Sequence, residues 1–216
     1  MFIHSFALLS TNLNGDLEPI MPLLSILIPT YNRQDEIQLL LTTLLQDRHD
    51  LEICIHDDGS NPPVEICQSQ IEDGTVKLSS GHNKGRAHAI LQCYKHASGQ
   101  FVMIFDDDDE IYQKGIDLIM EYCALHSDLS TSGFMFDMDG GEFQMQDYVP
   151  MTSRSGNFLS FRADMQLTGD KKEIVRRSSI DIKLLQLGEN YRRVPTSLYW
   201  ASIALHHGAL YVPKSI

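Results

Sequence analysis

The sequence predicts an α/β fold: a mostly parallel sheet with helices on both of its faces. Short apolar runs recur along the chain, and between them apolar residues follow the period of an α-helix. Three of the apolar runs pass directly into polar or acidic segments. Strands that alternate with helices pair in parallel, so their carboxyl ends should share one edge of the sheet, where α/β proteins bind ligands.

The composition is typical of one soluble globular domain. The chain has 216 residues, of which 43% are hydrophobic and 21% are charged. It contains no run of about 18 apolar residues, so no transmembrane helix is expected. No basic residue precedes the apolar patch at its start, as a secretory signal would require. The four cysteines lack C-x-x-C spacing and three lie in stretches expected to be buried, which indicates reduced thiols in a cytoplasmic protein.

The charge distribution argues against nucleic acid as a partner. The net charge is −12, and the sequence has no basic stripe. The first 170 residues hold 26 acidic and 9 basic side chains, whereas residues 171–216 hold 3 and 8. This basic C-terminal part is either a solvated surface or a region that faces phosphate or an anionic acceptor.

The first half of the chain alternates predicted strands and helices. Residues 1–22 show no clear periodicity and are expected to form an irregular leader. Buried strands are predicted where apolar runs are short and continuous, at residues 23–28, 51–55, 76–78 and 101–105. Helices are predicted where apolar residues share one face. They are expected at residues 35–46, 64–71 and 115–126, and in a further segment that opens at the turn 83–85 and ends at Gly99. Asn32 is the expected cap of the first.

The second half is less regular. Its predicted elements are strands at residues 132–136 and 173–177, a helix at 197–207 and a last strand at 209–212. Residues 137–170 are rich in Gly, Ser, Asp and Met, and they contain only one short expected strand, at 157–161. Because a strand is an unusual place for a chain to stop, we expect a truncated chain or a missing tail beyond Ile216.

The most informative segment is residues 101–110 (FVMIFDDDDE), in which a buried strand runs into four aspartates. Carboxylates so close together repel one another unless a cation or hydrogen-bond donors offset their charge. Ligands that are all oxygen favour a hard divalent ion, Mg²⁺ or Mn²⁺, which commonly arrives with a phosphorylated substrate. The alternative is an acidic loop that simply solvates the end of a strand.

Polar segments follow two other predicted strands at the same expected edge. PTYNR occupies residues 29–33 and DDGS residues 57–60, and NKGR opens a helix at residues 83–86. In this order, together with the four aspartates, the segments resemble the nucleotide-sugar half of family 2 glycosyltransferases, which have the GT-A fold. The resemblance is close over residues 23–112 and looser to the end. No G-x-G-x-x-G, P-loop or G-x-S-x-G pattern is present, which disfavours dinucleotide-binding, P-loop and α/β-hydrolase proteins.

The resemblance implies a metal-dependent, inverting glycosyltransferase. Such an enzyme would move a sugar from a nucleoside-diphosphate sugar, expected to be a UDP-sugar, to a hydroxyl of a glycan or lipid-linked acceptor in polysaccharide biosynthesis. Residues 23–136 would form the nucleotide-sugar-binding half of a Rossmann-like GT-A domain, and residues 137–216 its acceptor-side half. A cytoplasmic location is expected, and a lipid-linked acceptor leaves open a peripheral association with the inner face of the membrane.

The resemblance also assigns residues to the donor site. Thr30 and Tyr31 would line the base pocket, with Tyr31 stacking on the base, and Asp58 would accept a hydrogen bond from the edge of the base. Arg86 would lie near the base or the phosphates. The remaining expected contacts of the nucleotide-sugar in these segments are Pro29, Arg33 and Asn83.

The four aspartates would have different tasks, because two of them match the D-x-D motif of the family. Asp108 would be the metal ligand, with Asp106 toward the ribose and the metal, and Asp109 next to the donor sugar. Asp107 would be the spacer among these nucleotide-sugar contacts. A Mn²⁺ or Mg²⁺ ion between Asp108 and the diphosphate would stabilise the charge on the departing nucleotide.

The acceptor side departs from the family pattern. Inverting members usually place an acidic residue at the start of the late helix, where it deprotonates the acceptor hydroxyl, but Thr196 and Ser197 hold those positions here. The role of the base could pass to Asp170 or Glu189 in neighbouring loops. The alternative is a nucleotide-sugar-binding module that is catalytically weak or inactive. A nucleotidyltransferase is disfavoured, because residues 29–33 do not form a basic Gly-rich loop.

Overall fold

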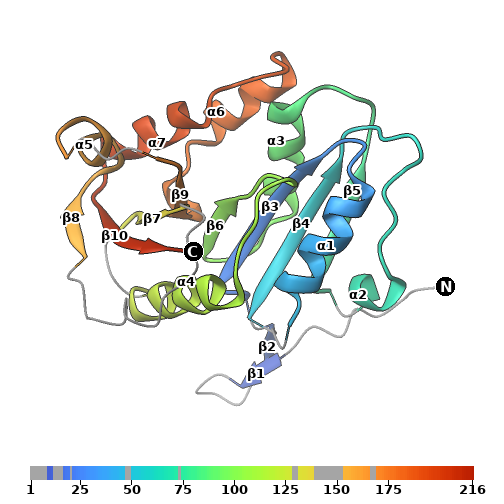
Figure 1. Cartoon of the computed structure of the whole chain (residues 1–216), viewed down its shortest axis with the longest axis horizontal. Coiled ribbons are helices and arrows are strands. Elements are labelled where there is room, and N and C mark those ends of the chain that lie inside the picture. Colours follow the sequence, from blue (N-terminus) through green and yellow to red (C-terminus); the bar gives the residue numbers. More distant parts are fainter. Residues whose placement is uncertain are drawn as a thin grey trace.

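The computed structural model describes residues 21–46, 50–72, 74–127, 131–138, 153–165 and 169–216, and the backbone of two short strands nearer the start. These two strands, β1 (Leu9–Thr11) and β2 (Leu17–Pro19), pair antiparallel to each other. The leader therefore contains a β-ladder that the sequence pattern does not predict. The rest of the described chain is built around one sheet of eight strands (Figure 1).

The eight strands have the spatial order β5-β4-β3-β6-β9-β7-β10-β8 and come from both halves of the chain. Their bounds are β3 Leu24–Thr30, β4 Leu51–Asp57, β5 Val76–Ser80, β6 Phe101–Ile104, β7 Gly133–Asp137, β8 Arg154–Gly156, β9 Lys171–Arg176 and β10 Ala209–Ser215. Four of the seven neighbouring pairs are parallel, namely β5-β4, β4-β3, β3-β6 and β7-β10. The sheet is therefore mixed, with the expected parallel majority.

The direction of the strands brings several strand ends to one edge of the sheet. Strands β3, β4, β6, β7 and β10 all end at this edge, which we call the carboxyl edge. Strand β9 is antiparallel to both of its neighbours, β6 and β7, so it begins at the carboxyl edge. Residues at the start of β9 consequently lie beside residues that follow β6.

Helices cover both faces of the sheet (Figure 1). Their bounds are α1 Gln34–Leu44, α2 Gln68–Glu72, α3 Arg86–His96, α4 Gln113–Leu125, α5 Phe158–Ala163, α6 Ile182–Leu185 and α7 Thr196–Ala204. Helices α1 and α4 bury their apolar residues in one cluster, which includes Ile26 of β3. Helices α3, α5, α6 and α7 contribute to a second cluster, which includes Leu27. Successive strand residues point to opposite faces, so β3 presents apolar residues to both clusters, and the hydroxyls of its buried Ser25 and Thr30 have hydrogen-bond partners.

The segment at residues 157–161 is a helix, so the predicted strand there is wrong. The side chain of Asn157 accepts hydrogen bonds from the backbone N–H groups of Leu159 and Ser160, and the Ser160 hydroxyl accepts one from the Asn157 N–H. This capping box satisfies the first free donors of α5. Phe158 and Phe161 are then buried on one side of the helix. An apolar segment this short does not distinguish a strand from a buried helix.

The starts of two other helices also differ from the prediction. Arg33, not Asn32, precedes α1, and the Asn32 side chain instead accepts a hydrogen bond from the N–H of Asn61 at 2.9 Å. Asn32 has a φ of 55°, a conformation that asparagine tolerates better than most residues. The helix predicted at residues 64–71 is reduced to α2, because Val64 is drawn toward β4 by a hydrogen bond from its N–H to Asp57.

The cysteines lie where the sequence pattern predicts. Cys54, Cys93 and Cys123 are buried, Cys67 is exposed, and all four are free thiols. Burial raises the pKa of the Cys54 thiol to about 12. Within the described ranges, no helix has both the length and the apolar character that a membrane span requires.

Candidate active site

The loops that follow β3 and β4 are fastened to each other at the carboxyl edge. The N–H of Asp58 donates to the carbonyl of Thr30 at 2.9 Å, and the Asn32 N–H donates to the hydroxyl of Ser60 at 2.8 Å. Gly59 has a φ of +85°, and a Cβ there would lie 2.9 Å from a backbone nitrogen, so the turn after β4 requires glycine. The two polar segments singled out in the sequence therefore form one continuous surface.

Asp58 holds the turn that opens α3. Its side chain is buried, and its two carboxylate oxygens accept the N–H groups of Lys84 at 2.8 Å and Gly85 at 2.7 Å. Gly85 has a φ of +98°, and a Cβ there would lie 2.5 Å from the carbonyl oxygen of Arg192. The turn places Arg86, the first residue of α3, at the carboxyl edge. Asp58 thus has a structural task that the sequence does not predict.

The four aspartates after β6 have different partners. Asp107 accepts a hydrogen bond from the buried Thr30 hydroxyl at 2.7 Å. Partial burial of Asp107 and the negative charges of Asp108 and Asp106 raise its pKa, although the Thr30 hydroxyl counteracts them. The structure gives Asp107 an anchor that a spacer would not need.

Asp106 and Asp109 are each paired with a cation from another element. Arg86 donates through Nε at 2.9 Å and Nη2 at 2.6 Å to one carboxylate oxygen of Asp106. Lys172 of β9 donates to Asp109 at 2.7 Å, and its ammonium lies 4.6 Å from the centre of the Phe105 ring. The antiparallel pairing of β9 with β6 is what brings Lys172 to this position.

Asp108 is the most open of the four carboxylates. Its side chain is 56% exposed, and Arg33 Nη2 lies 3.5 Å from its Oδ2, at the outer limit of a hydrogen bond. The Arg33 guanidinium is held more closely by Glu36, at 3.0 Å. The hydrogen bond that Arg33 donates to Glu36 is the main cause that raises the pKa of Arg33, and the charges of Asp107 and Asp108 add to it. Asp108 therefore keeps most of its oxygen lone pairs free for a ligand.

The acid set fits a hard divalent cation if a substrate supplies further ligands. Asp106 and Asp108 offer only oxygen, which suits Mg²⁺ and Mn²⁺. Among the residues that the structure describes, one group of three possible metal-ligating side chains has its ligand atoms within 4.8 Å of one another, and it consists of His56, Asp58 and His88. The aspartates after β6 do not converge in this way. They suit an ion that is shared with a diphosphate, which is how Mg²⁺ is commonly held.

Three adjoining cavities open at the carboxyl edge, and all three border Arg86 and Asp106. The β3 cavity, of about 340 Å³, is lined by Pro29, Thr30, Tyr31, Arg33, Asp58, Asp107, Asp108 and Arg193. The β9 cavity, of about 410 Å³, is lined by Asp108, Asp109, Asp170, Lys171, Lys172, Glu173, Thr196 and Trp200, among others. The α7 cavity, of about 460 Å³, is lined by Arg193, Val194, Pro195, Thr196 and Ser197. The Arg86–Asp106 pair thus stands where the three cavities meet.

Two predicted site residues lie outside these cavities. Asn83 is engaged by Arg192, which donates to its carbonyl at 3.2 Å and also contacts its side-chain oxygen. Glu189, one of the two expected bases, faces Lys95 of α3 at 3.9 Å. The other expected base, Asp170, lines the β9 cavity together with Thr196. The structure therefore brings together all the predicted site residues except Asn83 and Glu189.

Several residues of the site were not predicted. Lys172 and Arg193 belong to the basic C-terminal part, whose charge was the only signal for them. Glu173 is 9% exposed and lies 3.5 Å from Nη2 of Arg162. Burial raises the pKa of the Glu173 carboxyl, although Arg162 and Lys172 counteract it. No local pattern distinguishes Glu173 from an ordinary polar strand residue.

The chain is similar in sequence to known glycosyltransferases. The family model described as glycosyl transferase family 2 matches residues 25–180. The GalNAc(5)-diNAcBac-PP-undecaprenol beta-1,3-glucosyltransferase of Campylobacter jejuni is 32% identical over 106 residues, which are 47% of this chain and 34% of that protein. The chain thus matches about a third of the length of this curated relative.

Two solved structures share the fold. Staphylococcus aureus TarS 1-349 in complex with UDP-GlcNAc has a TM-score of 0.61 and 21% identity, over 89% of this chain and 56% of that chain. The mannosyltransferase PcManGT from Pyrobaculum calidifontis, in complex with GDP-Man and Mn²⁺, has a TM-score of 0.54 and 19% identity, over 89% and 55%. At these identities the likeness establishes the architecture of the sheet and its helices.

Proposed function

Because the chain belongs to glycosyl transferase family 2, we propose that it transfers a sugar from a UDP-sugar to a hydroxyl of a lipid-linked glycan, with inversion at the anomeric carbon. The observation that carries the proposal is the junction of three cavities at the Arg86–Asp106 pair, with Asp108 exposed at two of them. A donor and an acceptor that enter separate cavities can meet at the end of β6.

The β3 cavity suits the nucleotide. Tyr31 is 48% exposed at this cavity and offers a ring on which a base can stack. Each carboxylate oxygen of Asp58 has two lone pairs, so Asp58 can still accept an N–H of the base after its two backbone hydrogen bonds. Arg86 and Arg193 supply positive charge for the diphosphate. The UDP-GlcNAc complex of the TarS structure supports UDP as the nucleotide.

We assign a Mn²⁺ or Mg²⁺ ion to Asp108, with Asp106 as a second ligand. A bound divalent ion supplies Lewis-acid stabilisation of the negative charge on the departing diphosphate. Arg86 would hold the Asp106 carboxylate in place through its two hydrogen bonds. Lys172 would likewise hold Asp109, whose carboxylate would then face the donor sugar. The Mn²⁺ and GDP-Man in the mannosyltransferase structure support this use of a metal.

The β9 cavity suits the acceptor. Its lining combines the indole of Trp200 with ionised and polar side chains, and a glycan presents both apolar ring faces and hydroxyl groups. The name of the Campylobacter relative specifies an acceptor linked to undecaprenol through a diphosphate. That name supports a lipid-linked acceptor for this chain, and with it a place of action at the membrane surface.

Titration calorimetry of UDP, with and without MnCl₂, tests the donor and metal assignments. We expect the affinity for UDP to fall at least tenfold without Mn²⁺, and Asp108→Ala to lose this Mn²⁺-dependent gain. The matched control is Glu121→Ala, which removes an exposed acid of α4 that lines none of the three cavities. An Asp108→Ala variant that bound UDP and Mn²⁺ as the parent does would show that the metal assignment is wrong.

A nucleotide-sugar-binding module without transfer is the second candidate. It is favoured by Thr196 and Ser197 at the start of α7, where neither side chain can act as a base near neutral pH. Incubation with UDP-glucose, UDP-galactose, UDP-GlcNAc and UDP-GalNAc separates the two candidates. Release of UDP with water as the acceptor supports the enzyme, whereas UDP binding without turnover of any of the four supports the module.

A further inference from the structure

The proposed reaction needs a base that the start of α7 does not provide. An acceptor hydroxyl must lose its proton as its oxygen attacks the anomeric carbon, and a positioned carboxylate is a suitable base for that proton. Helix α7 begins with Thr196 and Ser197, preceded by Pro195. An acid that serves the same point in space must therefore come from another element.

Glu173 of β9 occupies that space. Val175, two residues further along β9, packs in the cluster that contains Trp200 of α7. Because strand residues two apart share a face, the Glu173 side chain points to the α7 side of the sheet. Glu173 also lines the β9 cavity together with Thr196 and Trp200. Its carboxylate lies in the cavity onto which the first turn of α7 faces.

The same cavity contains the acids that we assign to the donor and the metal. Asp108 and Asp109 follow β6 and line this cavity, and Asp109 is paired there with Lys172. An acceptor in the β9 cavity would therefore contact both the donor sugar and Glu173. Arg162 Nη2 lies 3.5 Å from the Glu173 carboxylate and can orient it.

The electrostatic surroundings of Glu173 suit proton transfer. Glu173 is 9% exposed, and this burial raises the pKa of its carboxyl in spite of Arg162 and Lys172. A base whose pKa lies nearer the working pH accepts a proton more effectively. Asp170, in contrast, is exposed in the loop before β9.

We propose that Glu173 is the catalytic base of this glycosyltransferase, an inference that rests on the proposed function. The Glu173 carboxylate takes the proton of the acceptor hydroxyl while the acceptor oxygen forms a bond to the anomeric carbon. The bond between that carbon and the diphosphate oxygen breaks, and its electron pair leaves with UDP. The base of the reaction thus comes from β9 and not from α7.

Hydrolysis of the four UDP-sugars by the full chain with MnCl₂ tests this assignment, with and without sodium azide. Water must lose a proton when it attacks, whereas azide forms its bond to the anomeric carbon without losing one. We expect Glu173→Gln to lower UDP release with water by about a hundredfold or more. Azide should restore UDP release by this variant to the parental level, and the affinity for UDP with Mn²⁺ should stay within about twofold.

Two other variants make the result specific. Glu121→Gln, which replaces an exposed acid of α4 outside the cavities, should release UDP at the parental rate. If Asp170→Asn and not Glu173→Gln lost water-dependent release and regained it with azide, Asp170 would be the base and our inference would be wrong. Parental release by Glu173→Gln, or a loss that azide does not restore while UDP still binds, would also overturn it.

Failure of the proposed function would look different. A parent chain that released UDP neither with water nor with azide would overturn the glycosyltransferase proposal, and the inference with it. Thermal unfolding shows whether Glu173→Gln is folded. If it is not, Glu173→Asp keeps the charge but withdraws it by one methylene, and it should lose at least tenfold in water-dependent release. A parental rate for Glu173→Asp would then overturn the inference.

Discussion

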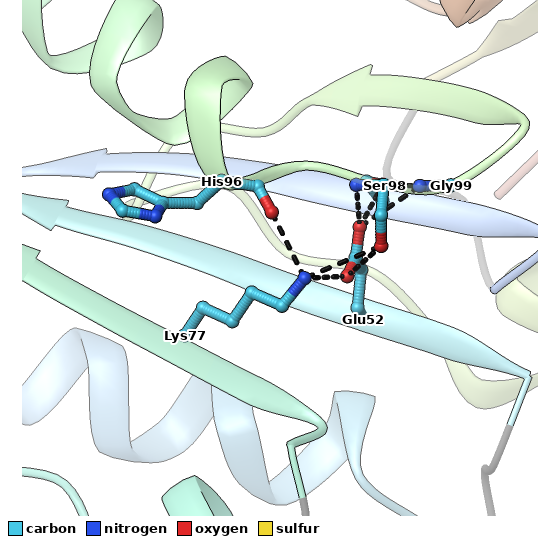
Figure 2. Close-up of polar contacts among 6 residues, drawn as sticks. Glu52, Lys77, His96, Ser98 and Gly99 are labelled. Carbon is cyan, nitrogen blue, oxygen red and sulfur yellow. Dashed lines mark hydrogen bonds and ion pairs between the residues drawn. The ribbon is translucent and has the colours of Figure 1, made fainter. Parts of the chain in front are cut away.

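Glu52 at the amino edge of the sheet and the four aspartates after β6 at its carboxyl edge have opposite surroundings. At the amino edge, where β3, β4 and β6 begin, Glu52 is only 3% exposed. It accepts hydrogen bonds from Lys77 (2.5 Å), the Ser98 hydroxyl (2.9 Å) and the backbone N–H groups of Ser98 and Gly99 (Figure 2). The Ser25 hydroxyl also donates to it, at 2.5 Å. Burial by itself would raise the pKa of Glu52, but these hydrogen bonds outweigh it and lower the pKa.

At the carboxyl edge the four aspartates that follow β6 are only partly satisfied. In the described part of the chain, the side chains of Asp106, Asp107 and Asp109 each have one hydrogen-bonding partner, and Asp108 is exposed with Arg33 at 3.5 Å. Acidic side chains therefore have two different roles around this sheet. A carboxylate whose lone pairs are all filled by protein donors stabilises the fold, whereas one whose lone pairs remain open can bind a solute.

Removal of divalent cations should affect only the carboxyl edge. Under our proposal, excess EDTA is expected to lower the turnover of UDP-sugars at least a thousandfold, about 4 kcal/mol, because charge on the leaving diphosphate is no longer stabilised. The melting temperature of the nucleotide-free chain should change little, because Lys77 and backbone donors satisfy Glu52 without a metal. Turnover that persisted after dialysis against EDTA would remove the metal from the mechanism.

Glu52→Gln should affect only the amino edge. The substitution removes the charge that faces Lys77 and leaves an amide N–H₂ directed at donors, so we expect the free energy of unfolding to fall by roughly 2 kcal/mol. Lys77 is 35% exposed, and solvent moderates the loss. Urea unfolding measures the change, with Glu121→Gln as the control. The affinity for UDP should stay within about twofold, and a large loss of affinity would contradict the separation of the two edges.

Acidification should reduce the contribution of Glu52 to the stability of the fold. Because the pKa of Glu52 is lowered in the folded chain, its contribution to stability is fully present above the pKa of the unfolded side chain, about 4.3. The contribution is lost as the pH falls from that value through the folded pKa. The melting temperature of the parent should therefore drop more steeply below about pH 5 than that of Glu52→Gln. Parallel curves for the two proteins would mean that Glu52 does not couple stability to pH.

Thr30→Val should produce the smallest change, at the carboxyl edge. Valine has the branched shape of threonine but cannot donate the 2.7 Å hydrogen bond to Asp107. We expect a loss of about 1 kcal/mol, seen as roughly fivefold weaker binding of UDP with Mn²⁺, and little change in the melting temperature. Unchanged binding would mean that Asp107 is a spacer, as the resemblance to the family implied.

Local sequence pattern was sufficient to predict most elements of residues 23–112. The strand runs, the helix faces and the order of the polar segments predicted β3, β4, β6, α1 and α3, and the family match and the shared fold confirm the resemblance. The partner of each aspartate could not be predicted in this way. Thr30 and Asp107 are 77 positions apart, and their contact depends on the parallel pairing of β3 with β6.

By itself, the sequence determined that these strands are buried and that acids follow β4 and β6. Burial on both faces of a sheet demands continuous apolar runs, and such runs are visible locally. Only the tertiary structure decided what faces those acids. Strand β9 pairs antiparallel between β6 and β7, and this brings Lys172 to Asp109 across 63 positions and puts Glu173 in the cavity beside α7. Pairing between distant segments leaves no local pattern, because it is set by the packing of the whole sheet.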